Sequence, residues 1–229
     1  MNSLSKDGSV HVTDERINTI VSLVGSMFSV VLGSILLTSV LFARKAGAHH
    51  TVAEILSATV YILGFANLFV MSTLHHGLDL SPRVNSVLRT LDYSAIFWHI
   101  AATVTVFVIF IFRDNYGYSI AIATWIIAAA GVAVRASIPS LPKHITNTLF
   151  ITLGWLPATG LILHASSLGL LDFVLLGIGG ILYSVGFVMY VTERPNPIKG
   201  RLGFHEIWHV FVLVASLSHW LLIYRLVHL

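Results

Sequence analysis

The chain has 229 residues, of which 56% are hydrophobic and 10% are charged, and its mean hydropathy is +0.86. A soluble protein carries about 25% charged residues, so this composition excludes an ordinary soluble domain and is typical of an integral membrane protein. The net charge is +3 and the chain contains no cysteine, which excludes disulfides and thiolate metal sites. In so apolar a chain, the small excess of Lys and Arg indicates membrane topology rather than nucleic-acid binding.

Along the chain, the first 16 residues, MNSLSKDGSVHVTDER, are polar and carry both charge signs. They lack the basic n-region of a cleaved signal peptide, so we expect a short polar tail. We predict that residues 17–229 form a single transmembrane domain, without an internal repeat or a second folded module. A membrane-spanning helix needs about 20 mostly apolar residues. Seven stretches have that length and character: 17–42, 53–76, 91–112, 118–138, 145–166, 170–191 and 204–227.

The basic residues predict the orientation of this seven-helix bundle. The tail and the second, fourth and sixth connectors hold nine of the thirteen Lys and Arg residues, and the opposite side holds four (Arg44, Lys45, Arg113 and Arg225). Loops rich in Lys and Arg stay in the cytoplasm. We therefore predict an all-α integral membrane protein with a cytoplasmic N-terminus and an external C-terminus, in which helices satisfy their own backbone hydrogen bonds in lipid.

With that topology, three separate segments bring polar side chains to the cytoplasmic end. Span two ends with Ser72 and His76, span three begins near Asp92, and span seven begins with His205 and His209. Ionisable groups at membrane depth are costly and are functional candidates by default. Sequence spacing alone would not place these residues together, but the even number of crossings between the end of span two and the start of span seven (spans three to six) does.

The residue types are those of a zinc site. His205 and His209 are four apart, so they share one helix face and can bind one ion, and a histidine from span two completes a set of three. Three protein ligands leave a position for water, and bound zinc lowers the pKa of that water towards about 7. Asp92 is a candidate general base or a partner that orients a ligand, and Ser72 is placed to hydrogen-bond a ligand or the substrate.

Other interpretations of the same residues stay open at this point. The spacing does not decide between His75 and His76 as the third ligand, although His76 shares the face of Ser72. Asp92 could be an acid that the helix dipole favours near an N-terminus. His99 and His219 lie deeper in spans three and seven, and each could line a substrate cavity or form a hydrogen bond between helices. His219 is about 15 Å along the helix from His209, too far to bind the same ion.

The string HEIWH at 205–209 also matches the H-E-x-x-H pattern of zinc peptidases. The chain lacks the further metal ligands that such a peptidase needs. A metzincin needs a histidine six residues after the second one, where this chain has Ala215, and no acidic residue follows Glu206. We therefore expect the two histidines to bind metal and the glutamate to have no role in catalysis.

Four motifs together resemble the hemolysin III family, the bacterial branch of the progestin and adipoQ receptors, which include the adiponectin receptors, within the alkaline ceramidase superfamily. They are STLHH (72–76), LDYSAI (91–96), GGILYSVG (179–186) and FHEIWHVFVLVASLSH (204–219). The resemblance covers the chain from Glu15-x-x-Asn18 onward. It implies a multi-pass protein of the bacterial inner membrane with its zinc site on the cytoplasmic side. The implied ligands are His76, His205 and His209, with Asp92 holding the water and Ser72 supporting the site.

Three positions depart from the family pattern. Ser22 stands where a histidine is usual early in span one, and His75 stands where a tyrosine is usual. Beyond LDYSAI the chain reads AATVTVF (101–107) in place of a Gly-x-Tyr-Thr-Pro-like turn. These departures concern the substrate cavity more than the metal ligands.

The resemblance implies a zinc-dependent hydrolase that cleaves a lipid amide such as a ceramide. The alternative is a non-enzymatic membrane protein, receptor-like or pore-forming, with structural zinc, and a metallopeptidase is a distant third. A pore should show a polar stripe along several spans, whereas the polar residues gather at one depth, which favours a site over a channel. The expected partners are a lipid substrate and the bilayer, and no nucleic acid.

Overall fold

The computed structural model describes residues 6, 14–42, 44–45, 48–112, 114–138, 141–163 and 168–229. Most of the predicted tail lies outside the described residues. Within them the chain forms two short antiparallel strands and seven helices. The strands are β1 (Arg44–Lys45) and β2 (Ala48–His49). The helices are α1 (Glu15–Phe42), α2 (Val52–Gly77), α3 (Pro82–Ile111), α4 (Asn115–Ser137), α5 (Lys143–Leu163), α6 (Leu170–Thr192) and α7 (Phe204–His228).

The all-helical prediction is confirmed, and over the described residues each predicted span falls on one helix. Residues 164–166, the end of the fifth predicted span, lie outside the described residues. Six of the seven helices are long and apolar enough to cross a membrane, and among the described residues α5 is the one outside that set. Large apolar side chains are exposed along the outer faces; Phe42 is 76% exposed, for example. Such side chains need lipid around them, so the bundle belongs in a bilayer. Seven complete crossings and the orientation remain predictions.

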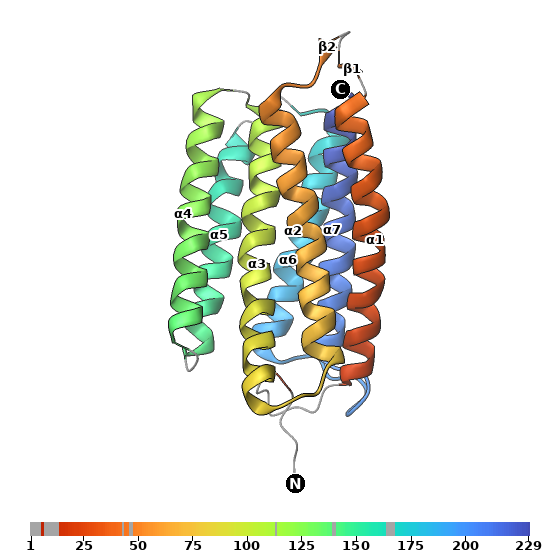
Figure 1. Cartoon of the computed structure of the whole chain (residues 1–229), viewed down its shortest axis with the longest axis vertical. Helices are drawn as coiled ribbons and strands as arrows, with labels where there is room; N and C mark the ends of the chain where they lie inside the picture. Colours follow the sequence, from red (N-terminus) through yellow and green to blue (C-terminus); the bar gives the residue numbers. More distant parts are fainter. Residues whose placement is uncertain are drawn as a thin grey trace.

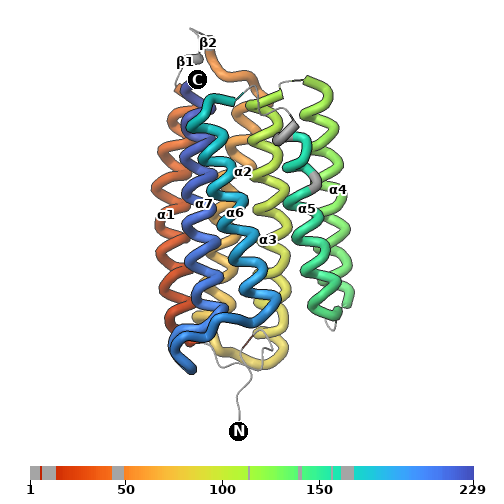
Figure 2. Tube along the Cα trace, turned by 180° about the vertical axis from the view of Figure 1, so that it is seen from behind, coloured from red at the N-terminus to blue at the C-terminus, as the bar shows by residue number. Residues whose placement is uncertain are grey.

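The helices run alternately up and down, so α1 begins at one end of the bundle and α7 finishes at the other (Figure 1). Helix α1 packs against α2 and α7, α3 packs against α2, α4 and α5, and α6 packs along α7. Figure 2 shows the same arrangement from behind, with α6 between α7 and α5. The end of α2 and the starts of α1, α3 and α7 therefore lie together at the lower end of the bundle.

Helix α3 begins nine residues before the predicted start of the third span, and this is a correction. Its first residue is Pro82, and the Ser81 hydroxyl accepts a hydrogen bond from the backbone N–H of Val84. A serine cap followed by a proline at the first helical position is a strong start signal. Because residues 82–90 are largely polar, hydropathy alone assigned them to a connector.

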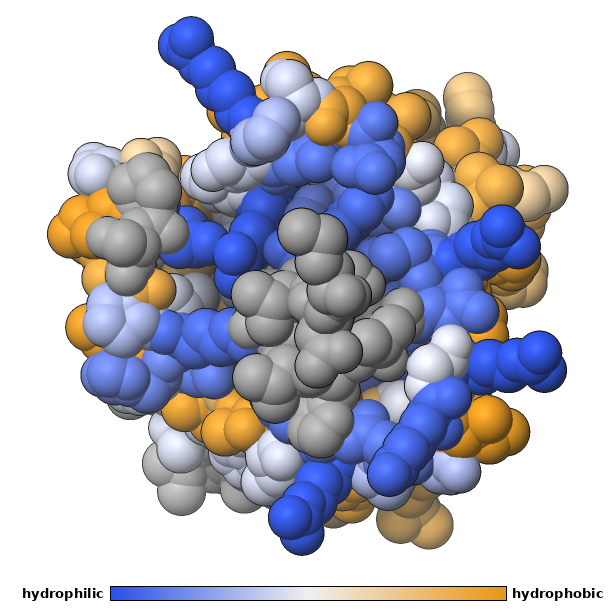
Figure 3. All heavy atoms as spheres, turned by 90° about the horizontal axis from the view of Figure 1, so that it is seen from below, coloured by the Kyte–Doolittle hydropathy of each residue, from blue (hydrophilic) through white to orange (hydrophobic). Residues whose placement is uncertain are grey.

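The lower end of the bundle is also the basic end. Its exposed side chains include Arg16, Arg83, Lys199 and Arg201. Figure 3 looks onto this end and shows hydrophilic residues towards the middle and apolar residues around the rim. The positive-inside rule predicts that this end faces the cytoplasm. Lys6, from the tail, is tied to the same end because its Nζ donates to the carbonyls of His76 and Leu78 at 3.1 and 2.7 Å.

Candidate metal centre

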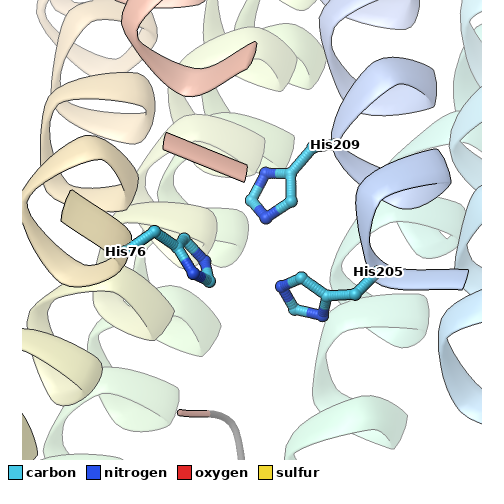
Figure 4. Close-up of side chains that lie close together, drawn as sticks. All are labelled: His76, His205 and His209. Carbon is cyan, nitrogen blue, oxygen red and sulfur yellow. The ribbon is translucent and has the colours of Figure 1, made fainter. Parts of the chain in front are cut away.

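Three histidine rings meet at the lower end of the bundle. His76 comes from the last turn of α2, whereas His205 and His209 come from the first turns of α7. Each offers a ring nitrogen within 4.8 Å of the others, and all three side chains are buried. Their ring centroids are 4.8 to 5.2 Å apart, and the rings point towards one central space (Figure 4). This convergence fits one metal ion bound by three imidazoles.

A carboxylate orients the ring of His76. Its Nδ1 lies 2.6 Å from Oε2 of Glu15, at the start of α1. A carboxylate accepts hydrogen bonds, so Nδ1 carries the proton and Nε2 keeps a lone pair. That Nε2 is buried and has no hydrogen-bond partner among the described residues. A ligand histidine that donates its other N–H to a carboxylate is the usual arrangement around protein-bound metals, so the residues present fit an ion.

Asp92 and His75 lie on the α3 side of the triad. The Asp92 carboxylate, the His75 ring and the His76 ring offer atoms that all lie within 4.8 Å of one another. Asp92 is half-buried, and it also lines the cavity described below. The carboxylate therefore lies beside His76 of the triad, at the lower end of the cavity. Of the two candidate histidines on α2, His76 is the one that joins His205 and His209.

Two hydroxyls support the opposite side of the triad. Ser72, one turn before His76, has its Oγ 2.9 Å from Oγ of Ser22 on α1. Ser22 Oγ also lies 3.4 Å from Nδ1 of His209. Ser22 occupies the position that departs from the family pattern, and it hydrogen-bonds within the site rather than supplying a ligand ring.

Glu206 forms the cap at the start of α7. Its side chain is fully buried, and its two carboxylate oxygens accept the backbone N–H groups of Gly203 at 2.7 Å and Asp14 at 2.6 Å. A glutamate three residues into a helix that bonds back to the residue before it satisfies an otherwise orphaned donor. These bonds account for the burial of Glu206 without a catalytic role.

An apolar cavity of about 350 Å³ rises from the triad into the bundle. Side chains from α2, α3, α5, α6 and α7 line it, and His205, His209, Ser72 and Asp92 stand at its lower end. Such a volume lies in the range of small-ligand sites. Towards α5 and α6 the lining includes Gly154, Gly177 and Gly180, and an added Cβ at any of these would meet nothing within 4 Å. The cavity therefore has open space beside these glycines of α5 and α6.

The five residues predicted from the sequence, Ser72, His76, Asp92, His205 and His209, lie at one end of the bundle, as the topology argument expected. Sequence reasoning missed the part played by α1, which supplies Glu15 and Ser22. The signal was present in the spacing of Glu15, Asn18 and Ser22, because polar residues three and four apart form one face of an otherwise apolar helix.

The fold and this site define a multi-pass helical membrane protein with a candidate three-histidine metal centre. The family model described as Haemolysin-III related matches residues 10–220, so the chain belongs to that family. It is 31% identical over 205 residues to Hemolysin-3 of Bacillus cereus, covering 90% of this chain and 88% of the relative. It is 28% identical to the Hemolysin-3 homolog of Bacillus subtilis, with 90% of each chain covered. It is 25% identical over 179 residues to the human Monocyte to macrophage differentiation factor, covering 75% of this chain and 71% of the relative.

Proposed function

We propose that this protein is a zinc-dependent membrane hydrolase that cleaves the amide bond of a lipid such as a ceramide, at the cytoplasmic end of the bundle. The observation that carries the proposal is the convergence of His76, His205 and His209 beside Asp92, at the lower end of an apolar cavity. A structural metal site would need the ligands but neither the carboxylate nor the cavity.

His76, His205 and His209 would hold the ion. Imidazole ligands suit zinc, and three of them leave one position of a tetrahedral site open, as in catalytic zinc centres. When bound, zinc supplies hydroxide at neutral pH by lowering the pKa of water, and it polarises a carbonyl as a Lewis acid. Glu15 holds His76 in the tautomer that presents Nε2 to the ion.

The remaining polar groups have separate roles in the proposal. The Asp92 carboxylate accepts a proton from the attacking water and returns it to the amine that leaves, the part of a general base and then a general acid. The Ser72 hydroxyl, which Ser22 fixes in place, hydrogen-bonds the carbonyl of the substrate. Glu206 takes no part, because its carboxylate is engaged by two backbone N–H groups.

The cavity accounts for the choice of a lipid. Its lining is mostly apolar and lies within the membrane-spanning part of the bundle, so an acyl chain gains by entering it. The glycines on the α5 and α6 side leave room for a chain to enter from that direction.

The test is fatty-acid release from N-acyl sphingoid lipids by the purified full chain in lipid nanodiscs, measured by mass spectrometry. Asp92→Asn should keep about one zinc per chain and lose about 10²- to 10⁴-fold in rate, the usual contribution of a general acid–base group. Glu206→Gln is the matched control and should keep the rate.

Release of no fatty acid by the zinc-loaded wild type would contradict the proposal. So would equal rates for wild type and Asp92→Asn. Dye leakage from vesicles, measured in parallel, would then identify the pore-forming alternative, and an absence of both activities would favour a receptor-like protein.

A further inference from the structure

A second group of polar side chains lines the cavity halfway up the bundle. Nε2 of His99 on α3 lies 3.1 Å from the Tyr183 hydroxyl on α6, and that hydroxyl lies 2.7 Å from Oγ of Ser216 on α7. The ring of His219, one turn beyond Ser216, lies beside the Tyr183 ring with centroids 5.5 Å apart. His99, Tyr183 and His219 all line the cavity. We call these four residues the mid-cavity cluster.

One ring nitrogen of His219, Nδ1, is a hydrogen-bond acceptor without a donor among the described residues. Its Nε2 faces the backbone carbonyl of Leu176 at 3.4 Å, and a carbonyl can only accept, so Nε2 carries the proton. Nδ1 is then an acceptor. It is buried and has no hydrogen-bond partner among the described residues. Leaving such an atom unsatisfied is costly, so a donor that reaches it would be bound favourably.

Two hydroxyls at the same depth add to this excess of acceptors. The Thr103 hydroxyl donates to the carbonyl of His99 at 2.8 Å, and the Ser184 hydroxyl donates to the carbonyl of Gly180 at 2.7 Å. Each oxygen keeps lone pairs after donating its proton, and both side chains line the cavity. A molecule bound at this depth would therefore gain by bringing a hydrogen-bond donor.

The His219 ring packs closely against the backbone of α6 at Gly179. An added Cβ at Gly179 would lie 2.2 Å from the ring atoms Cδ2 and Nε2, so glycine is the residue that lets α6 approach this imidazole. A bond between helices would explain the contacts among His99, Tyr183 and Ser216. It does not explain an imidazole that lines the cavity with an acceptor to spare.

The helix geometry sets the distance of this band from the metal centre. Ser216 and His219 lie seven and ten residues beyond His209, about 10 and 15 Å along α7. A fully extended chain advances roughly 1.2 Å per bond, so this distance corresponds to about 8 to 12 bonds from the reacting carbonyl.

We propose that the mid-cavity cluster binds a hydroxyl group in the middle of an acyl chain, with the hydroxyl donating to Nδ1 of His219. The inference rests on the proposed function in one respect: it takes the carbonyl end of the lipid to lie at the metal centre. It names the substrate class more closely: acyl chains hydroxylated about 8 to 12 bonds from the carbonyl, in preference to plain chains of equal length.

The experiment measures binding of free fatty acids to the zinc-loaded full chain, by displacement of a fluorescent fatty acid. The probes are stearic, 2-hydroxystearic, 10-hydroxystearic and 12-hydroxystearic acids. The 10- and 12-hydroxy acids should bind about threefold to tenfold more tightly than stearic acid, the gain of one satisfied buried hydrogen bond. The 2-hydroxy acid should show no such gain, because its hydroxyl lies at the wrong depth.

His219→Leu should abolish the preference, and His219→Gln, which keeps an acceptor, should restore part of it. Tyr190→Phe is the matched control. It removes a hydroxyl from the same cavity at the level of the metal centre, where Tyr190 bonds Tyr93 at 2.8 Å, and it should keep the preference.

Equal affinities of the wild type for all four acids would overturn the inference whatever the variants do, and would indicate that water alone satisfies the cluster. A preference that survives in His219→Leu would also overturn it. Because binding needs no turnover, the two proposals fail separately. A hydroxyl preference without amide hydrolysis contradicts the hydrolase, and hydrolysis without a hydroxyl preference contradicts the mid-cavity site.

Discussion

The lower cluster, which is the three histidines of the metal centre, and the mid-cavity cluster share helix α7 but differ in what surrounds their rings. In the lower cluster, His76, His205 and His209 turn their ring nitrogens towards each other within 4.8 Å. In the mid-cavity cluster, His99 faces the Tyr183 hydroxyl and His219 faces a backbone carbonyl. Buried imidazoles need compensation. The arrangement below suits a cation at the centre, whereas the arrangement above suits hydrogen bonds, so an intramembrane histidine says little about metal until its partners are known.

The largest expected effect is the loss of zinc when two ligands of the lower cluster are removed. The double variant His205→Ala, His209→Ala keeps a single ligand ring, and we expect its zinc content, measured by mass spectrometry of the purified protein, to fall from about one per chain to background. His219→Ala is the control on the same helix and should keep its zinc. Retention of zinc by the double variant would show that the metal binds elsewhere in the protein.

The next effect tests the carboxylate that sets the lower cluster apart. Glu15→Gln removes the charge that fixes the proton on Nδ1 of His76. Loss of such a partner typically weakens metal binding by about 10- to 100-fold, which a competition titration with a zinc chelator would measure. Asp172→Asn, which disrupts an ion pair with Arg225 at the far end of α7, is the control and should leave zinc affinity unchanged. An unchanged affinity in Glu15→Gln would contradict the proposed role of the Glu15 charge in orienting His76.

A smaller effect separates the cap of α7 from the metal site it adjoins. Glu206→Gln weakens two backbone hydrogen bonds at the start of the helix, so we expect a loss of about 1–2 kcal/mol in the free energy of unfolding. Zinc affinity of the folded protein should stay the same. Thermal unfolding and a zinc titration of one preparation would check both. Loss of lipid-amide hydrolysis in a folded Glu206→Gln protein that retains zinc would contradict the account by giving Glu206 a catalytic role.

The smallest expected effect is the change in stability when the hydrogen bonds that the mid-cavity cluster makes between helices are removed. Tyr183→Phe removes the hydroxyl that joins His99 to Ser216. Hydrogen bonds between membrane helices average about 0.6 kcal/mol, so the melting temperature should fall only slightly and zinc should be retained. Thermal unfolding in detergent would measure this change. Loss of zinc in Tyr183→Phe would show that the two clusters are coupled, contrary to their separation along α7.

Much of the fold could be predicted because hydropathy reports the lipid-facing surface directly. The same information placed His76 and His205 at one end, since the number of crossings between α2 and α7 decides it. The extension of α3 back to Pro82 was missed because its first turns are polar. The approach of Glu15 and Ser22 was missed because the position of α1 beside α2 and α7 depends on side-chain packing. Hydropathy carries no information on which helices are neighbours.

The most direct test of the central claim is X-ray absorption spectroscopy at the zinc edge of the protein purified from membranes. The account predicts three histidine nitrogens and one oxygen at the distances typical of tetrahedral zinc, about 2.0–2.2 Å. The spectrum of His219→Ala should be the same. A shell composed only of oxygen atoms, or a protein that binds no zinc in its folded state, would contradict it.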